Sequence, residues 1–219
     1  MSDPQELWLT QIVFPTASVG RFLRDARKTH QMIMGMFPDD LGVHPRRACG
    51  ALYRIEPTER QVVILVQSTI EPKTKKFAHS RTLSLAPLLD RLTEGATVRY
   101  RIAANPIKSA KTPGDRSRGQ RKALHGHHAE EWWERKAHEA GLHLTLTRSR
   151  RYDFAAAPPT EEPPETDDKK PDRLLHHGVR FEGLAEITDP KALTTAIVDG
   201  IGRGKAHGLG LLSIIPQET

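Results

Sequence analysis

The sequence predicts an α+β fold of two tandem ferredoxin-like domains, each a βαββαβ unit with an antiparallel sheet. The length supports this prediction, because 219 residues suffice for one large or two small domains with buried cores. The order of apolar patterns supports it as well, since strand-like runs and helical stretches follow one another in the same order in both halves. We therefore expect one domain at residues 1–104 and another at residues 105–219.

In the first half of the chain, four strands and two helices are expected. The first helix begins after Ser18, whose side chain can cap it, and apolar residues then recur at a spacing near 3.6 as far as Pro38. The strand that ends this half is expected to close the first sheet, and Asn105-Pro106 marks the turn to the second unit. The predicted strands span residues 7–14, 49–55, 61–67 and 97–103, and the second helix spans residues 85–92.

The second half repeats this order with weaker signals. Asp189 and Pro190 favour the cap and the first turn of a helix that reaches about Val198. Another helix is expected over residues 129–140, where Gly141 provides a C-terminal stop. The strands of this half are expected near residues 121–124, 142–147, 179–187 and 211–215.

Charge is concentrated in one part of the chain. The net charge is +6 and the pI about 9.6, but residues 99–151 carry 13 basic and 5 acidic residues, a net charge of +8. Such a segment is typical of proteins that bind a phosphate backbone, although a solvated basic surface has the same composition. The stretch at about residues 155–172 is rich in proline and acid and nearly free of apolar residues, which predicts a mobile surface loop.

Eleven residues near the end of the chain contain five glycines: Gly200, Gly202, Gly204, Gly208 and Gly210. Glycine allows close approach to a ligand, and successive amides in such a loop can bind an anion. Arg203 and Lys205 stand beside these amides, so we expect phosphate contact; a mobile connection is the alternative. The segment is not a P-loop, because Ala206 follows Lys205, and its place after a helix excludes the dinucleotide fingerprint.

His30, on the first predicted helix, is the candidate general acid or base. An imidazole with a pKa near 6.5 can accept or donate a proton at cellular pH. Arg27 and Lys28 precede it closely and are candidate electrostatic stabilisers of negative charge. A lone helical histidine more often has only a structural role, so the alternative to catalysis is a surface or core histidine.

Two basic tracts are candidate nucleic-acid contacts. Arg148 and Arg150 alternate at the end of a predicted strand and so share one face, with Arg151 beside them. A projecting hairpin at this position can enter a nucleic-acid groove. The earlier tract contributes Lys108, Lys111, Arg121 and Lys122.

Several classes of protein are excluded or disfavoured. The single cysteine, Cys49, excludes an internal disulfide framework and a multi-thiolate zinc site, and we expect it in the core. Only 5% of residues are aromatic, which disfavours stacking on single-stranded bases. No metal is expected at His125-Gly-His127-His128, because we expect no carboxylate or thiolate at ligand spacing beside these histidines. No apolar run is long enough to span a membrane and no secretory signal is visible, so a cytoplasmic location is expected.

Four segments together resemble the CasE family of CRISPR-associated endoribonucleases. The similarity runs nearly end to end and is interrupted by the acidic loop; the glycine-rich ending is its most specific part. The segments are Leu7-Trp-Leu-Thr10, the helical histidine followed by Met36-Phe-Pro38, Tyr100-Arg-Ile-Ala-Ala-Asn-Pro-Ile-Lys108, and Gly200-Ile-Gly-Arg-Gly-Lys-Ala-His-Gly-Leu-Gly-Leu-Leu-Ser213.

The resemblance implies a protein that binds the repeat hairpin of precursor CRISPR RNA and cleaves at its 3′ base without a metal or cofactor. The 2′-hydroxyl would attack the adjacent phosphate to leave a 2′,3′-cyclic phosphate, and the protein would remain bound as a subunit of the Cascade complex. The family's catalytic histidine falls on His30 and its glycine-rich loop on residues 200–210. Its RNA contacts fall on Lys108, Arg121, Lys122 and a groove-entering hairpin at residues 148–151.

One position departs from the family pattern. Members commonly have a tyrosine three residues before the histidine, whereas this chain has Arg27, whose guanidinium cannot act as a base. A non-catalytic RNA-hairpin-binding protein of the same fold is therefore the alternative function. A pair of small-molecule regulatory domains is a third possibility, although such domains have no need of the basic segment.

Overall fold

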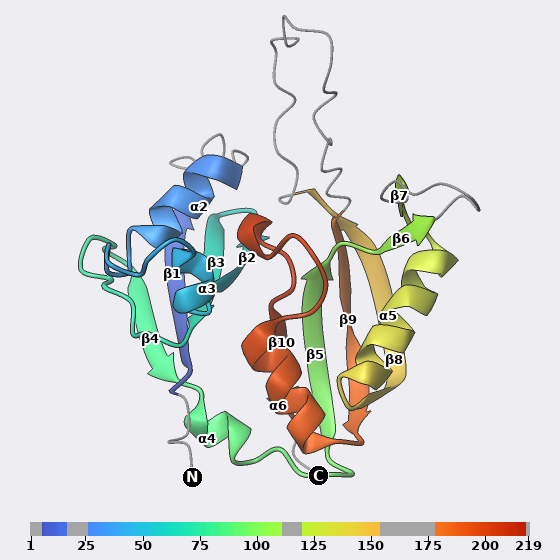
Figure 1. The fold of residues 1–219 in the computed structure, drawn as a ribbon. Helices are drawn as coiled ribbons and strands as arrows, with labels where there is room; N and C mark the ends of the chain where they lie inside the picture. The colour runs from blue at the N-terminus through green and yellow to red at the C-terminus, as the bar shows by residue number, and fades with distance from the viewer. Residues whose placement is uncertain (1–5, 17–25, 111–119, 154–177, 218–219) are drawn as a thin grey trace, which may run out of the picture.

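The computed structural model describes residues 6–16, 26–110, 120–153 and 178–217. Within these ranges the chain forms two four-stranded antiparallel sheets and a separate two-stranded ribbon (Figure 1). The strand order is β2-β3-β1-β4 in the first sheet and β10-β5-β9-β8 in the second. Both orders are those of a ferredoxin-like unit, and the predicted α+β fold with two tandem units is confirmed.

The first unit is built around β1. Thr10 and Ile12 of this strand are fully buried, because alternate side chains of a central strand point into the core. Ile33, Met36 and Phe37, in and just after helix α2, pack on the sheet in the first core. The elements are β1 (Trp8–Pro15), α2 (Ala26–Met34), α3 (Pro45–Ala48), β2 (Leu52–Pro57), β3 (Gln61–Ser68), β4 (Ser80–Ser84) and α4 (Ala86–Leu89).

The second unit has the larger aromatic core. Trp133 is fully buried, stacks on Phe181 with ring centroids 5.6 Å apart, and lies 5.5 Å from the ring of Tyr100. Asp189 caps its second helix, as predicted, by accepting hydrogen bonds from two backbone amides. The elements are β5 (Thr97–Ala104), β6 (Ile107–Ala110), β7 (Gln120–Ala123), α5 (His127–Glu139), β8 (Leu142–Tyr152), β9 (Gly178–Ile187), α6 (Pro190–Asp199), the 3₁₀ turn η2 (Lys205–His207) and β10 (Leu212–Pro216).

The strand predicted at residues 97–103 forms as β5, but its assignment to the first sheet was wrong. β5 pairs with β9 and β10, and the first sheet is instead closed by β4, which pairs with β1. β4 is polar and only half-buried, so it has no apolar pattern that predicts a strand. The chain therefore passes to the second sheet between Ser84 and Thr97, ahead of the expected boundary at residue 104.

Other elements differ from the prediction at their ends. The strand predicted at residues 49–55 begins only at Leu52, because α3 and a turn precede it. The short strand predicted near residues 121–124 is β7, which pairs with β6 outside the main sheet. The acidic loop expected at residues 155–172 lies outside the described residues. Among the helices in the described ranges, none has the length and apolar character needed to cross a membrane.

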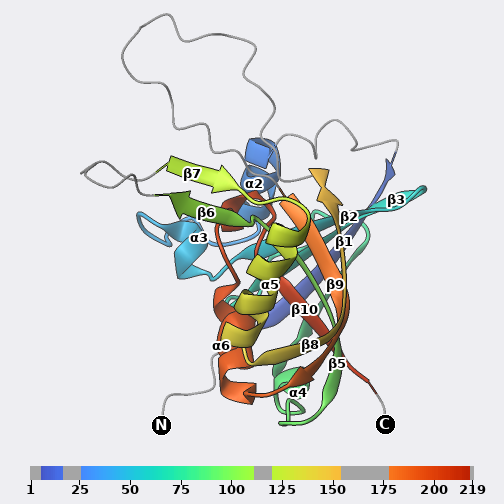
Figure 2. The same ribbon diagram turned by 90° about the vertical axis from the view of Figure 1, so that its right-hand side faces the viewer.

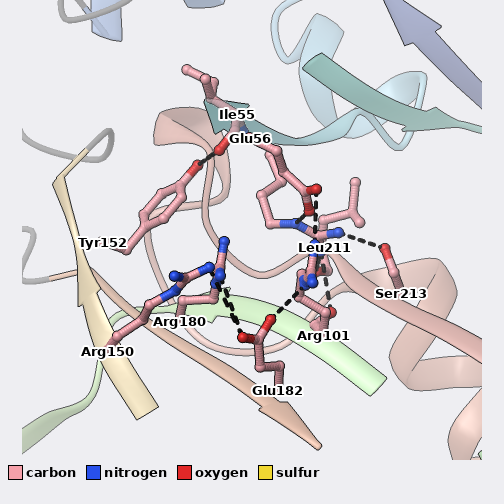
Figure 3. Close-up of polar contacts among 10 residues, drawn as sticks. Ile55, Glu56, Arg101, Arg150, Tyr152, Arg180, Glu182, Leu211 and Ser213 are labelled. Carbon is pink, nitrogen blue, oxygen red and sulfur yellow. Dashed lines mark hydrogen bonds and ion pairs between the residues drawn. The ribbon is translucent and has the colours of Figure 1, made fainter. Parts of the chain in front are cut away.

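A buried arginine of the first unit, Arg54, joins the two sheets; Figure 3 labels its partners Glu56, Arg101, Leu211 and Ser213. Arg54 on β2 has a side chain only 2% exposed, and its Nη1 donates to the carbonyl oxygens of Arg101 at 3.1 Å and Leu211 at 2.9 Å. Its Nη2 donates to Ser213 Oγ at 3.0 Å, and its Nε donates to Glu56 Oε1 at 2.8 Å. A buried guanidinium is tolerated only when its donors are satisfied, so these bonds hold β2 beside β5 and β10.

Further polar contacts extend this junction. The Tyr152 hydroxyl accepts a hydrogen bond from the Ile55 amide at 2.8 Å and donates to the Ile55 carbonyl at 3.0 Å. Gln67 Nε2 on β3 donates to the Ile197 carbonyl of α6 at 2.6 Å. Bonds from β2 and β3 to four elements of the second unit, β5, β8, β10 and α6, hold the two units in a fixed relation.

Candidate active site

His30 lies at the flank of α2, beside the first core. Thr29 and Ile33, which are one helical turn apart, are both buried, and their burial sets the rotation of the helix. His30 follows Thr29 and is half-buried. Burial lowers the pKa of its imidazole below the ordinary value, and the Arg46 cation lowers this pKa further. The ring is therefore neutral at pH 7 and able to accept a proton.

Helix α3 supplies a cation, Arg46, that acts on this ring. Arg46 is half-buried, and its Nη1 donates to the Ala51 carbonyl at 3.1 Å, which fixes the guanidinium beside the start of β2. Arg47 is exposed. Sequence reasoning missed both arginines. The run Pro45-Arg46-Arg47 is visible in the sequence, but its approach to α2 depends on contacts distant along the chain.

The glycine-rich loop leaves α6 and reaches back to the first unit. Its 3₁₀ turn η2 packs against both β2 and α2 (Figures 1 and 2). The Tyr53 hydroxyl on β2 donates to the Ala206 carbonyl at 3.0 Å. Gly208 has φ +77°, and a Cβ there would lie 3.0 Å from the Tyr53 ring, so glycine is required for this contact. The loop is thus held against the first unit.

This packing brings His207 to His30 and Lys205 to the arginines of α3. His207 is half-buried, and burial together with the charge of His30 lowers the pKa of its imidazole. Lys205 donates to the Asp199 carbonyl, and burial with the Arg46 and Arg47 charges lowers the pKa of its ammonium. These cations and imidazoles form a positive, half-buried site in which a phosphate would meet several donors.

Only part of the predicted catalytic set meets here. Lys28 is exposed, and residues two apart on a helix do not face each other, so it does not share the flank of His30. Arg27 belongs to α2, but its side chain is not among those the structure describes. Lys205 belongs to the site, whereas Arg203 is exposed. His207 was not predicted, although it stands within the glycine motif that the sequence singled out.

The predicted basic tract forms a ribbon on the second unit. Lys108 on β6 pairs with Lys122 on β7, so both exposed side chains lie on one face. Lys108 also lines a hollow of about 610 Å³ with Trp132 and Arg135 of α5. Lys111 and the side chain of Arg121, also predicted contacts, lie outside the described residues.

The predicted arginine hairpin is formed by β8 and β9. β8 runs to Tyr152, so Arg148, Arg150 and Arg151 all lie on the strand, and all are exposed. Arg150 Nη2 lies 3.9 Å from Glu182 Oε1 and lines a hollow of about 460 Å³ together with Arg151. Exposed arginines beside a hollow provide donors for phosphate oxygens.

The histidine cluster at the start of α5 does contact a carboxylate. His127 Nε2 and His128 Nδ1 lie 3.3 and 3.1 Å from the two oxygens of Glu131. The expectation that no carboxylate accompanies these histidines was therefore wrong, because Glu131 follows His127 by one helical turn. Across the described ranges, no group of three or more His, Cys, Asp or Glu side chains is arranged to hold a metal ion.

Known proteins resemble this chain along nearly its whole length. The family described as CRISPR associated protein matches residues 7–216. The CRISPR-associated endoribonuclease Cse3 of Thermus thermophilus is 29% identical, and the CRISPR system Cascade subunit CasE of Escherichia coli is 27% identical; each match covers 96% of this chain and 100% of the relative. A structure of Thermus thermophilus Cse3 bound to an RNA representing a pre-cleavage complex matches with a TM-score of 0.72 and 26% identity, over 96% of this chain and 100% of that one. The family resemblance inferred from the sequence is confirmed.

Proposed function

The chain belongs to the CRISPR-associated protein family, and on that premise we propose that it is a metal-independent endoribonuclease for precursor CRISPR RNA. It binds the repeat hairpin and cleaves at its 3′ base. The observation that carries this proposal is the position of a neutral, half-buried His30 beside Arg46 and the glycine-rich loop. The relative named as a CRISPR-associated endoribonuclease supports the same activity.

The chemistry requires proton transfer and stabilisation of negative charge. The 2′-oxygen attacks the adjacent phosphorus, the bond from phosphorus to the 5′-oxygen breaks, and a 2′,3′-cyclic phosphate and a 5′-hydroxyl result. Neutral His30 accepts the proton of the 2′-hydroxyl, a contribution of roughly 10²–10⁴-fold in rate. Arg46 and Lys205 stabilise the charge that develops on the phosphate oxygens.

In this proposal the second unit makes most of the contacts with the RNA. Lys108 and Lys122 on the β6–β7 ribbon, with the exposed arginines of β8, contact phosphates of the hairpin. Because η2 packs on α2, the unit that holds the hairpin also shapes the site that cuts it. Positioning of this kind aligns the attacking and leaving oxygens and lowers the entropic part of the barrier.

After cleavage the protein stays on its product and joins the other subunits of Cascade. The relative named as a Cascade subunit supports this step. The alternative function is a non-catalytic protein that binds the same hairpin, and the observation in its favour is Arg27 at the position where the family commonly has tyrosine.

The test is cleavage of a labelled cognate repeat by the wild type, by His30→Ala and by the control His143→Ala, which changes an exposed histidine on β8. We expect His30→Ala to lose cleavage while its affinity for the hairpin stays close to wild type. The product should carry a cyclic phosphate, and EDTA should leave the rate unchanged. Binding without cleavage by the wild type would instead establish the non-catalytic alternative.

Two further outcomes would reject parts of the mechanism. Cleavage by His30→Ala at the wild-type rate would show that His30 has no catalytic role. Loss of wild-type activity in EDTA, restored by added Mg²⁺, would replace the proposed mechanism with a metal-dependent one.

A further inference from the structure

A second imidazole, that of His207, lies across the interface between the units from His30. His207 ends η2, which packs against α2, and both rings are half-buried. η2 (the red turn beside α2 in Figures 1 and 2) comes from the second unit, whereas α2 belongs to the first. Each unit therefore contributes one histidine to the same site.

The backbone around His207 is built to hold this position. Gly204 and Gly208 flank η2, and both have left-handed φ angles, +87° and +77°. The His207 amide donates to the Gly204 carbonyl at 2.8 Å, which closes the turn. The Tyr53 hydroxyl binds the carbonyl of the residue before His207, at 3.0 Å. A turn fixed at both ends and anchored to β2 presents its side chain in a defined place.

Burial lowers the pKa of both rings, and the reactive form is the pair that holds one proton, with one ring to accept and the other to donate. His30 and His207 repel each other when both are protonated, so the pair holds a single proton more easily than two. Arg46 lowers the pKa of His30, so this cation disfavours a proton on the ring that is proposed to accept one. Further titratable groups among the described residues around the site include Lys205 on η2, Arg47 on α3, Asp199 at the end of α6 and Tyr53 on β2.

We propose that His207 is the proton donor to the leaving 5′-oxygen of the scissile phosphate. The proposal rests on the endoribonuclease function proposed above. His30 takes the proton of the 2′-hydroxyl as the bond from O2′ to phosphorus forms. His207 gives its proton to O5′ as the bond from phosphorus to O5′ breaks. The reaction then leaves His30 protonated and His207 neutral, and exchange with water restores both.

The test compares His207→Gln, His30→Ala and the exposed control His143→Gln on two repeat RNAs in single-turnover cleavage. One RNA is the natural repeat, and the other carries sulfur in place of O5′ at the scissile bond. A thiolate leaves without a proton donor, so this substrate no longer needs a general acid. We expect His207→Gln to cleave the natural repeat roughly 10²–10⁴-fold more slowly and the sulfur substrate close to the wild-type rate. His30→Ala should be slow on both.

Hairpin affinity and thermal unfolding, measured for each variant, separate chemistry from misfolding. His207→Gln that cleaves the natural repeat at the wild-type rate would overturn the proposal. The proposal would also be overturned if His207→Gln bound RNA with wild-type affinity but cleaved both the natural repeat and the sulfur substrate slowly. The residue would then have a structural role. Rescue of His30→Ala instead would reverse the two assignments and reject the proposal. Failure of the wild type to cut either RNA would reject the proposed function itself, which is a distinguishable result.

Discussion

The two units have the same strand order but differ in what covers their sheets. In the second unit both α5 and α6 pack on the sheet, over a core that contains Trp133 and Phe181. In the first unit the link from β3 to β4, residues 69–79, is described throughout and forms turns instead of a helix. Its sheet is covered mainly by α2, and its core is smaller.

Because of this difference, the stable core and the candidate catalytic residue lie in different units. The second unit is complete, because two helices cover its sheet, and it provides the scaffold, the basic ribbon and the arginine hairpin. The first unit is incomplete, because its link from β3 to β4 forms no helix, and it carries His30. The incomplete unit depends on its neighbour for orientation, because Arg54 and Gln67 both bond across the junction. A site assembled from η2 and α2 is therefore only as well ordered as the contact between the two units.

The largest effect is expected from breaking the junction. Arg54→Ala leaves Glu56 and two carbonyl groups without the partner they have now, and we expect a loss of about 3–5 kcal/mol in the free energy of unfolding. Arg99→Ala, which removes an exposed arginine of β5, is the matched control. Denaturant unfolding gives both values. Equal midpoints for the two variants would show that the junction does not support the first unit.

The next effect concerns RNA binding by the second unit. Replacing Arg148, Arg150 and Arg151 together by alanine should weaken hairpin affinity and reduce the slope of log K against log salt by roughly 2–3, since each lost phosphate contact removes about 0.7–0.9. The control replaces three exposed cations of the first unit: Arg60, Lys73 and Lys75. Binding titrations at several salt concentrations measure the affinity and this slope for both variants. An unchanged slope for the arginine variant would show that the β8–β9 hairpin of the protein does not contact RNA phosphates.

A smaller effect is expected where the glycine loop contacts the first unit. Gly208→Ala combines a left-handed φ with a Cβ only 3.0 Å from the Tyr53 ring. We expect a loss of about 1–2 kcal/mol in stability from the backbone and an added loss of cleavage as η2 shifts. Gly42→Ala has a similar φ, +74°, and open space around its Cβ, so it should lose stability alone. Equal cleavage by the two variants would contradict the role of this contact.

The smallest effect is a shift in the pH dependence of cleavage. It is measured from the position of the acidic limb and not from the maximal rate, which the loss of Arg46 beside the phosphate also lowers. Arg46 lowers the pKa of His30, so Arg46→Gln should raise that pKa. As the base must be neutral, the acidic limb of the cleavage rate should move to higher pH, and activity just above the wild-type limb should fall. Arg47→Gln removes the same charge from the same helix and should leave the position of the limb in place. A pH–rate profile of each variant makes the comparison.

Local sequence patterns predicted most elements because their causes are local. Asp189-Pro190 starts α6 as expected, since a cap and a first-turn proline act within a few residues. Apolar alternation likewise predicted β1, β3 and β9 to within about a residue or two. The same patterns could not predict which strands pair. Alternation shows that β5 is a half-buried strand, but its neighbours β9 and β10 come from distant parts of the chain.

The candidate site divides in the same way. Local patterns were enough to identify the histidine on a helix, the glycine-rich loop, the basic segment and the family they indicate. Three further features appear only in the folded chain: Arg46 lies beside His30, η2 with His207 packs on α2, and Arg54 is buried between the sheets. The physical reason is that helices, caps and turns depend on neighbours in the chain. A shared electrostatic site depends on packing between units, which no local pattern specifies.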